Sequence, residues 1–297
     1  MANLREVRTR ITSVKSTRQI TGAMKMVSAS KLRKAQNAIE SLRYYADHLK
    51  DILNDINKTI SLSQNHDLSA HKEGKKALLM ICSSNKGLCG PFNTHILKKS
   101  TTYINWLIDQ GFEVSLYIIG KKANDFFKNR EYEIIHFDHE VNDKVSFENA
   151  INVSEHLKKL FLEDDFARID AVYNRFKNVV VQEPVSEKIL PVDIFKEENI
   201  SEANTNIDDE QHFKHILEPS QELIVNDIIP KVIDVEIYRI LLDSYASEQG
   251  ARMTAMHQAT ENASELIKEL TLTYNKVRQA SITRELVEIV SGAEALK

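Results

Sequence analysis

Over its first sixty residues the chain places apolar side chains at alternating steps of three and four positions. This spacing is typical of the heptad seam of an α-helix that winds on another helix. Residues 1–73 contain no proline, and Gly22 is their one glycine, so little interrupts the helical pattern. The pattern predicts one coiled-coil helix over residues 1–62. From Leu32 onward its seam consists of Ala35, Ile39, Leu42, Ala46, Leu49, Leu53, Ile56 and Ile60.

A second seam of the same period lies at the other end of the chain, over residues 219–297. It turns polar at Gln249 and Arg252 and then resumes. Pro230 either kinks this helix or starts its long part, because proline is tolerated only in the first turn of a helix. Since each seam must bury one face, we expect the two terminal helices to pack as an antiparallel coiled coil. The second seam consists of Val235, Tyr238, Leu242, Tyr245, Met256, Ala259, Ala263, Leu266, Leu270, Thr273, Val277 and Ala280.

Residues 76–195 show a different pattern, in which strands alternate with helices. This alternation predicts a central, mostly parallel, Rossmann-like α/β domain with helices on both faces of the sheet. Residues 179–181 and 188–190, around a turn at Pro184, can add an antiparallel pair. The acidic residues 196–215 are expected to form a solvated linker. The predicted strands are residues 76–83, 112–119, 131–137 and 167–173, and the predicted helices are residues 92–109, 121–129 and 146–161.

The composition agrees with a helix-rich chain that has a real core. The 297 residues are 42% hydrophobic, which is enough for one or two domains. Aromatic residues make up 7%, with eight glycines and five prolines, which favours helices over turn-rich β structure. No apolar run approaches the ~20 residues that span a bilayer, so we expect no direct membrane insertion. Cys82 and Cys89 are expected to be reduced thiols, because two cysteines make no disulfide framework.

The loop at residues 84–93 (SNKGLCGPFN) follows the first predicted strand and precedes a helix, where phosphate-binding loops occur. It lacks the GxxxxGK[ST] and GxGxxG spacings, so a tight strand-to-helix turn is the preferred interpretation. His136 and His139 are a weak metal signal, and the other histidines are scattered. We therefore predict no catalytic residues, no metal site and no cofactor bound by this chain.

Residues 1–36 hold nine lysines and arginines against a single acid, Glu6. Such a basic helix could bind nucleic acid, but no aromatic residue precedes Tyr44 and no DNA-binding spacing occurs. A mitochondrial transit peptide has a similar composition. The apolar spacing continues unbroken past this segment, which argues that it stays in the mature protein. Two interpretations of the basic segment remain: a solvated face, or a face directed at acidic loops of a partner protein.

Several motifs, in the right order along the chain, resemble the gamma subunit of the F-type ATP synthase. Residues 9–36 (TRITSVKSTRQITGAMKMVSASKLRKAQ) resemble its N-terminal helix, and GLCGPFN at 87–93 is similar to a motif of its central domain. Residues 246–260 (ASEQGARMTAMHQAT) and 262–272 (NASELIKELTL) resemble its C-terminal helix. The family signature, Ile/Val-Thr-x-Glu-x-x-Asp/Glu-x-x-x-Gly-Ala, is met by ITRELVEIVSGA at 282–293.

The chain also departs from that family. Gly22 stands where a larger helix former is usual, and this should cost the helix up to about 1 kcal/mol. Asn85-Lys86 and Pro91 replace the usual Asp-Arg and Gly around GLCG. Residues 139–215 carry no matching motif, so no contact is assigned to them.

The resemblance implies a central rotor shaft. The two terminal helices would turn inside a three-fold ring of alpha and beta subunits, and the α/β domain, with the epsilon subunit, would stand on the membrane c-ring. Ion flow would turn the shaft and change the catalytic sites of the partner subunits in sequence. The partner-contact residues that the resemblance implies are Met24, Lys25, Lys31, Arg33, Lys34, Arg252, Arg278, Gln279, Thr283, Glu285 and Glu288.

A shaft also accounts for the small residues that interrupt the first seam. Small side chains on facing helices would allow close approach and keep the pair slim. We expect Ala23, Ser28, Ala29 and Ser30 to face Ala251, Ala255, Ala259 and Ala263.

A static coiled-coil scaffold is an alternative function, and a nucleotide-binding α/β enzyme is another. The expected location is the cytoplasmic face of a bacterial plasma membrane, held there through the complex.

Overall fold

The computed structural model of the chain describes residues 4–57, 67–70, 72, 74–164, 166–192 and 221–294. Two long helices, α1 (Leu4–Asn57) and α5 (Gln221–Glu294), flank an α/β region in the sequence. The last part of the predicted first helix, 58–62, and the predicted acidic linker, 196–215, lie outside the described residues. The chain forms two compact units: Lys31–Ala251, and Met1–Ser30 with Arg252–Lys297.

The larger unit contains a five-stranded sheet in the order β3-β2-β1-β4-β5. The first four strands along the chain are parallel, and β5 pairs antiparallel with β4. The prediction of a mostly parallel sheet is confirmed. The strands are β1 (Lys76–Cys82), β2 (Glu113–Ile119), β3 (Glu133–Asp138), β4 (Phe166–Phe176) and β5 (Gln182–Leu190).

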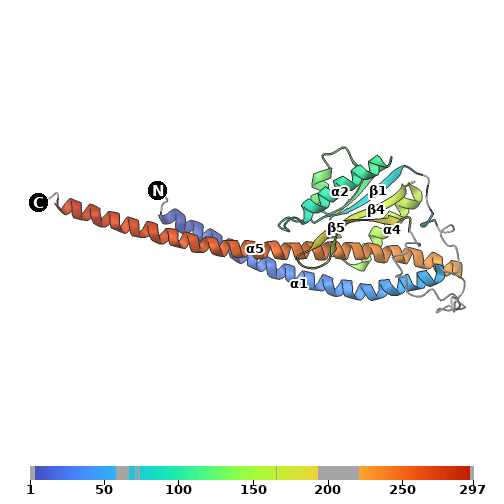
Figure 1. The fold of residues 1–297 in the computed structure, drawn as a ribbon, viewed down its shortest axis with the longest axis horizontal. Helices are drawn as coiled ribbons and strands as arrows, with labels where there is room; N and C mark the ends of the chain where they lie inside the picture. The colour runs from blue at the N-terminus through green and yellow to red at the C-terminus, as the bar shows by residue number, and fades with distance from the viewer. Residues whose placement is uncertain are drawn as a thin grey trace, which may run out of the picture. The chain divides into compact units, whose positions relative to one another are not determined.

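Helices cover both faces of this sheet (Figure 1). Residues of β1 and β2 that point to one face pack against α2 (Phe92–Asp109) and α3 (Lys121–Phe127). The opposite face packs against α4 (Phe147–Glu163) and the first part of α5. Continuous apolar strands such as KALLMIC in β1 are explained by this burial on both sides.

In the same unit, the second half of α1 packs on α5 through the predicted seam. Leu42 and Leu49 of α1 form an apolar cluster with Val235 and Leu242 of α5. The heptad pattern therefore identified the buried stripe of both helices in this region.

A partly buried charged network joins α5 to the edge strand β5. Arg239 Nη2 donates to Glu187 Oε2 at 2.6 Å and to Glu236 Oε1 at 2.5 Å, and Tyr173 Oη donates to Glu187 Oε2 at 2.7 Å. Burial opposes ionisation of Glu187, but Arg239 and Tyr173 outweigh it and lower its pKa. Asp243 lies 3.5 Å from Arg239 Nη1, and burial raises the pKa of Asp243 to about 6 despite the opposing pull of Arg239.

The smaller unit consists of the first part of α1 and the last part of α5. Thr260 Oγ1 donates to Thr21 Oγ1 at 2.8 Å, and Lys25 Nζ donates to His257 Nδ1 at 3.2 Å. Residue numbers rise along α1 as they fall along α5, so the pair is antiparallel, as predicted. Val7, Ser28, Met256 and Ala263 are buried in this unit.

Of the two prolines with structural predictions, Pro184 lies elsewhere than expected, and Pro230 agrees with one of its two predicted positions, inside the helix. Pro184 does not form a turn: it lies within β5, opposite Asn174 of β4. An edge strand tolerates proline because one side of it needs no ladder hydrogen bonds. Pro184 has no N–H to offer, and the carbonyl of Asn174 accepts a hydrogen bond from Ser247 Oγ at 2.9 Å. Pro230 lies inside α5 and does not start it.

Candidate functional site

The basic residues assigned to partner contact on α1 lie on its exposed face. Lys31, Arg33 and Lys34 are exposed, whereas Leu32 and Ala35 between and beside them are buried in the larger unit. Because Leu32 and Ala35 follow the seam, the three cations must project away from it. These three charges therefore lie on a solvent-facing surface.

Met24 and Lys25 lie in the smaller unit and are half-buried. A lysine ammonium can only donate, so the bond to Lys25 fixes His257 Nδ1 as an acceptor. The other ring nitrogen, His257 Nε2, then faces Glu261 Oε1 at 3.6 Å. Lys25 is therefore held across the helix pair by His257, which itself lies beside Glu261, a polar link that sequence reasoning missed.

Arg252 differs from the other candidates because it is only 9% exposed. Most of its side chain is covered within the chain. A direct contact with a partner is therefore restricted to the small accessible part of this residue.

The remaining candidates lie near the end of α5 and are all exposed. Continuing the register of Thr21 with Thr260 places Leu4, the first described residue of α1, opposite Val277. Residues 278–294 of α5 therefore have no partner on the described part of α1. Within this segment Thr283 Oγ1 donates to the Gln279 carbonyl at 2.9 Å. The candidates here are Arg278, Gln279, Thr283, Glu285 and Glu288.

The same segment of α5 exposes large apolar side chains, which sequence reasoning did not single out. An isolated helix in water does not favour exposed apolar residues at this density, so they indicate an interaction surface. The sequence contained a sign of this surface, because apolar residues continue along α5 past Val277, which lies opposite the start of α1. These residues are Ile282, Leu286, Val287, Ile289 and Val290.

The prediction of a small-residue interface is correct only in part. Ser28 and Ala263 are buried in the smaller unit, and Ala29, Ala255 and Ala259 are half-buried. Ala23 and Ser30 are exposed, so their prediction as facing residues is wrong. Thr21 and Ser28, seven residues apart, lie on the seam, and Ala23 and Ser30, each two residues further along, are turned away from it.

The loop after β1 presents a strained, exposed leucine. Leu88 has a φ of 63° and is 65% exposed. Non-glycine residues rarely adopt this left-handed conformation and need support from their surroundings. Asn93 Oδ1 accepts hydrogen bonds from the backbone and the hydroxyl of Ser84 at 3.1 and 3.0 Å. Asn85 Nδ2 donates to the His139 carbonyl at 2.6 Å and so ties the loop to the end of β3.

This loop does not have the form of a phosphate cradle. The backbone N–H of Ser84 donates to Asn93 Oδ1 at 3.1 Å, and the backbone N–H of Phe92 donates to the Cys89 carbonyl at 3.3 Å. These amides are already satisfied by the protein. The preferred interpretation, a tight strand-to-helix turn, agrees with the geometry, whereas the exposed Leu88 was not foreseen.

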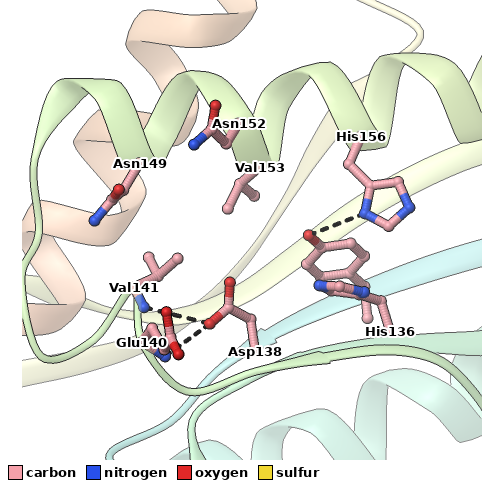
Figure 2. A pocket seen from close by; sticks show the side chains of 9 residues that line it. His136, Asp138, Glu140, Val141, Asn149, Asn152, Val153 and His156 are labelled. Carbon is pink, nitrogen blue, oxygen red and sulfur yellow. Dashed lines mark hydrogen bonds between the residues drawn. The ribbon is translucent and has the colours of Figure 1, made fainter.

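The two histidines considered as a metal signal do not converge. His136 packs against Tyr117 and His156, with ring centroids 4.7 Å apart in both cases, whereas His139 stacks on Phe137. Burial lowers the pKa of His156, with His136 and Lys159 acting in the same direction. Figure 2 shows His136 and His156 at one end of a pocket. Over the described residues, no group of three or more histidines, cysteines and acids could hold a metal ion.

No helix in the described part of the chain combines the length and apolarity needed to cross a membrane. Long paired helices with charged exposed faces, in a chain that also forms an α/β domain, define the class as a coiled-coil protein with an α/β domain. The model of a family described as ATP synthase matches residues 3–296.

Comparison with known proteins defines the family more closely. The chain is 48% identical to the ATP synthase gamma chain of Christiangramia forsetii, covering all of this chain and 99% of that protein. It is 44% identical to the gamma chain of Flavobacterium johnsoniae with the same coverage. The chain belongs to the ATP synthase gamma chain family.

Solved structures agree at the level of the fold. A chain of the Euglena gracilis mitochondrial ATP synthase in an OSCP/F1/c-ring structure matches with a TM-score of 0.67 and 23% identity, over 99% of this chain and 94% of that one. A chain of the Tetrahymena thermophila central stalk and c-ring structure matches with a TM-score of 0.56 and 24% identity, over 81% and 99% respectively. These chains thus share the predicted fold of long terminal helices with a central α/β domain.

Proposed function

We propose that this chain is the central rotor shaft of an F-type ATP synthase. It couples ion flow through a membrane c-ring to conformational changes in a ring of alpha and beta subunits. The observation that carries this proposal is the antiparallel pairing of α1 with α5, fixed by Thr21 with Thr260 and Lys25 with His257, in a member of the gamma chain family.

The chain itself works without a catalytic residue and without a bound cofactor. ATP chemistry takes place on the partner subunits, and this chain alters their conformational equilibria. Because a coiled-coil shaft is not three-fold symmetric, each orientation presents different groups to each catalytic subunit. This chain can shift the equilibrium between the open and closed states of a partner only if it binds the two states with different free energies. The size of the shift is set by that difference.

The exposed cations of α1 supply part of that difference. Lys31, Arg33 and Lys34 face solvent and are available to acidic groups of the beta subunits. Exposed ion pairs are worth about 1 kcal/mol or less each. Several such pairs can favour one angle of the shaft, and each is weak enough to release as the shaft turns.

The end of α5 supplies a second contact region. Arg278, Gln279 and Thr283 offer polar groups, and Glu285 and Glu288 offer charge, beside exposed apolar side chains. Met24, Lys25 and the accessible part of Arg252 complete the coupling residues. Of these, Lys25 depends on its bond to His257 for its position.

The α/β domain binds the epsilon subunit and the c-ring. The assembled complex holds the chain at the cytoplasmic face of a bacterial plasma membrane as a peripheral subunit. No nucleic acid takes part.

The direct test is purification of the chain from its native membranes with its partners. Quantitative mass spectrometry of the purified complex should give one copy of this chain for every three alpha and three beta subunits. A chain recovered alone, or in equal numbers with alpha and beta subunits, would exclude a single central shaft. A static scaffold is separated from a rotor by observing rotation of a bead attached to the α/β domain of immobilised complexes supplied with ATP.

A further inference from the structure

A pocket of about 320 Å³ lies between the sheet and α4 in the larger unit. Tyr117 of β2 and His136 of β3 line it, together with residues at and after the carboxyl end of β3 and residues of α4 (Figure 2). In open α/β sheets, ligands bind outside the carboxyl ends of the parallel strands. The pocket has no part in the proposed function as a rotor shaft.

The lining of the pocket is rich in hydrogen-bond acceptors. Asp138 Oδ1 accepts from the backbone N–H groups of Glu140 and Val141 at 2.7 and 3.3 Å. In Figure 2 the second carboxylate oxygen of Asp138 points toward α4, across the pocket. Asn149 Nδ2 donates to the Lys144 carbonyl at 2.8 Å, which leaves the Asn149 side-chain oxygen for another donor.

The charge of the lining has one sign. It includes the carboxylates of Asp138 and Glu140 and contains no lysine or arginine. Val141, near Glu140, and Val153 of α4 add apolar groups to the lining (Figure 2). A ligand that fits these groups must carry positive charge, donate several hydrogen bonds and have a short apolar body.

We propose that this pocket binds a small alkylammonium ion, a primary amine or a short diamine. Its ammonium group donates to Asp138, Glu140 and Asn149, and its methylene groups lie against Val141 and Val153. The imidazole of His156, whose Nδ1 lies 3.5 Å from Tyr117 Oη, and that of His136 close the far end. The site is independent of the helix pair and of the proposed rotor function.

The test is isothermal titration calorimetry of the full-length chain with 1,4-diaminobutane. The matched neutral probe, 1,4-butanediol, has the same chain length and no charge. We expect saturable binding of the diamine with one site per chain and no binding of the diol. The double variant Asp138→Asn, Glu140→Gln should weaken diamine binding at least tenfold, while its asparagine oxygen still caps residues 140 and 141.

The control variant is Asp125→Asn, which removes an exposed carboxylate of α3 outside the pocket lining. It should bind the diamine like the original chain. Absence of saturable diamine binding, equal binding of the diol, or unchanged binding by the double variant would each overturn the proposal. Circular dichroism of each variant establishes that the fold is retained.

Discussion

At the scale of single residues, the backbone is closely packed around Gly120 at the carboxyl edge of the sheet. Gly120, directly after β2, has a φ of 100°. A Cβ at this position would lie 2.2 Å from the Ser83 carbonyl oxygen and 2.7 Å from Asn142 Nδ2. The Gly120 N–H also donates to the Asp138 carbonyl at 2.7 Å, which joins the ends of β2 and β3.

We expect Gly120→Ala to destabilise the chain by at least about 2 kcal/mol, since it adds both backbone strain and a steric clash. Urea unfolding followed by circular dichroism measures the change. Gly87→Ala is the matched control, because a Cβ there has no heavy atom within 4 Å. If both variants unfolded at the same urea concentration, the packing described for Gly120 would be wrong.

Asp243 predicts a pH dependence of stability. Burial raises the pKa of Asp243 to about 6, from an ordinary value of 3.8. The folded chain therefore binds this proton more tightly than the unfolded chain. Its stabilising contribution is complete below pH 3.8 and is lost as the pH rises through about 6.

Asp243→Asn should remove this contribution to the pH dependence. Between pH 7.5 and pH 5, the original chain should gain about 1 kcal/mol of stability relative to the variant. Denaturant unfolding of both proteins at the two pH values tests this expectation. A constant difference in unfolding free energy at both values would show that Asp243 titrates normally.

At the scale of elements, the register of α1 on α5 is the feature with the greatest consequence. The heptad seams identified which stripe of each helix is buried, as with Leu42 and Val235. They did not identify which turn of α1 meets which turn of α5, because a seam repeats every seven residues. The hydrogen bond between Thr21 and Thr260 sets that register.

A cysteine pair tests the register directly. Thr21→Cys with Thr260→Cys should form a disulfide on mild oxidation, because the two hydroxyl oxygens lie 2.8 Å apart. The control pair, Thr21→Cys with Thr273→Cys, should not, since thirteen residues of helix correspond to roughly 20 Å. Gel mobility of tryptic fragments distinguishes the outcomes. Efficient cross-linking of the control pair and not of the first pair would contradict this register.

At the scale of the whole molecule, the two compact units have different structural roles. The larger unit builds a sheet covered on both faces and ties α5 to it through Arg239 and Glu187. The smaller unit is a helix pair whose α5 continues past its described partner. A subunit that converts rotation into conformational change requires both a firm base for α5 and an exposed surface further along it.

We expect Arg278→Ala with Gln279→Ala to lower ATP hydrolysis by the assembled complex by up to roughly thirtyfold, because two contacts of about 1 kcal/mol each together amount to about 2 kcal/mol. The isolated chain should stay folded, because both residues are exposed. Lys128→Ala with Asn129→Ala is the control, an exposed cation and amide pair on the α/β domain. Normal turnover by the first variant would remove Arg278 and Gln279 from the coupling surface.

The sequence by itself determined the type and order of the elements. Unbroken apolar runs predicted buried parallel strands, and the three-four spacing predicted the long helices, because these periods follow from backbone geometry alone. The resemblance of its motifs predicted the family.

Only the tertiary structure decided what depends on segments far apart in the chain. It buried most of Arg252, turned Ala23 and Ser30 away from the helix pair, and placed Pro184 inside an edge strand. It also brought Asp138 and Asn149 to one pocket. Local periodicity fixes which face of an element is apolar, but the partner of that face is chosen by packing among distant elements, which no local pattern contains.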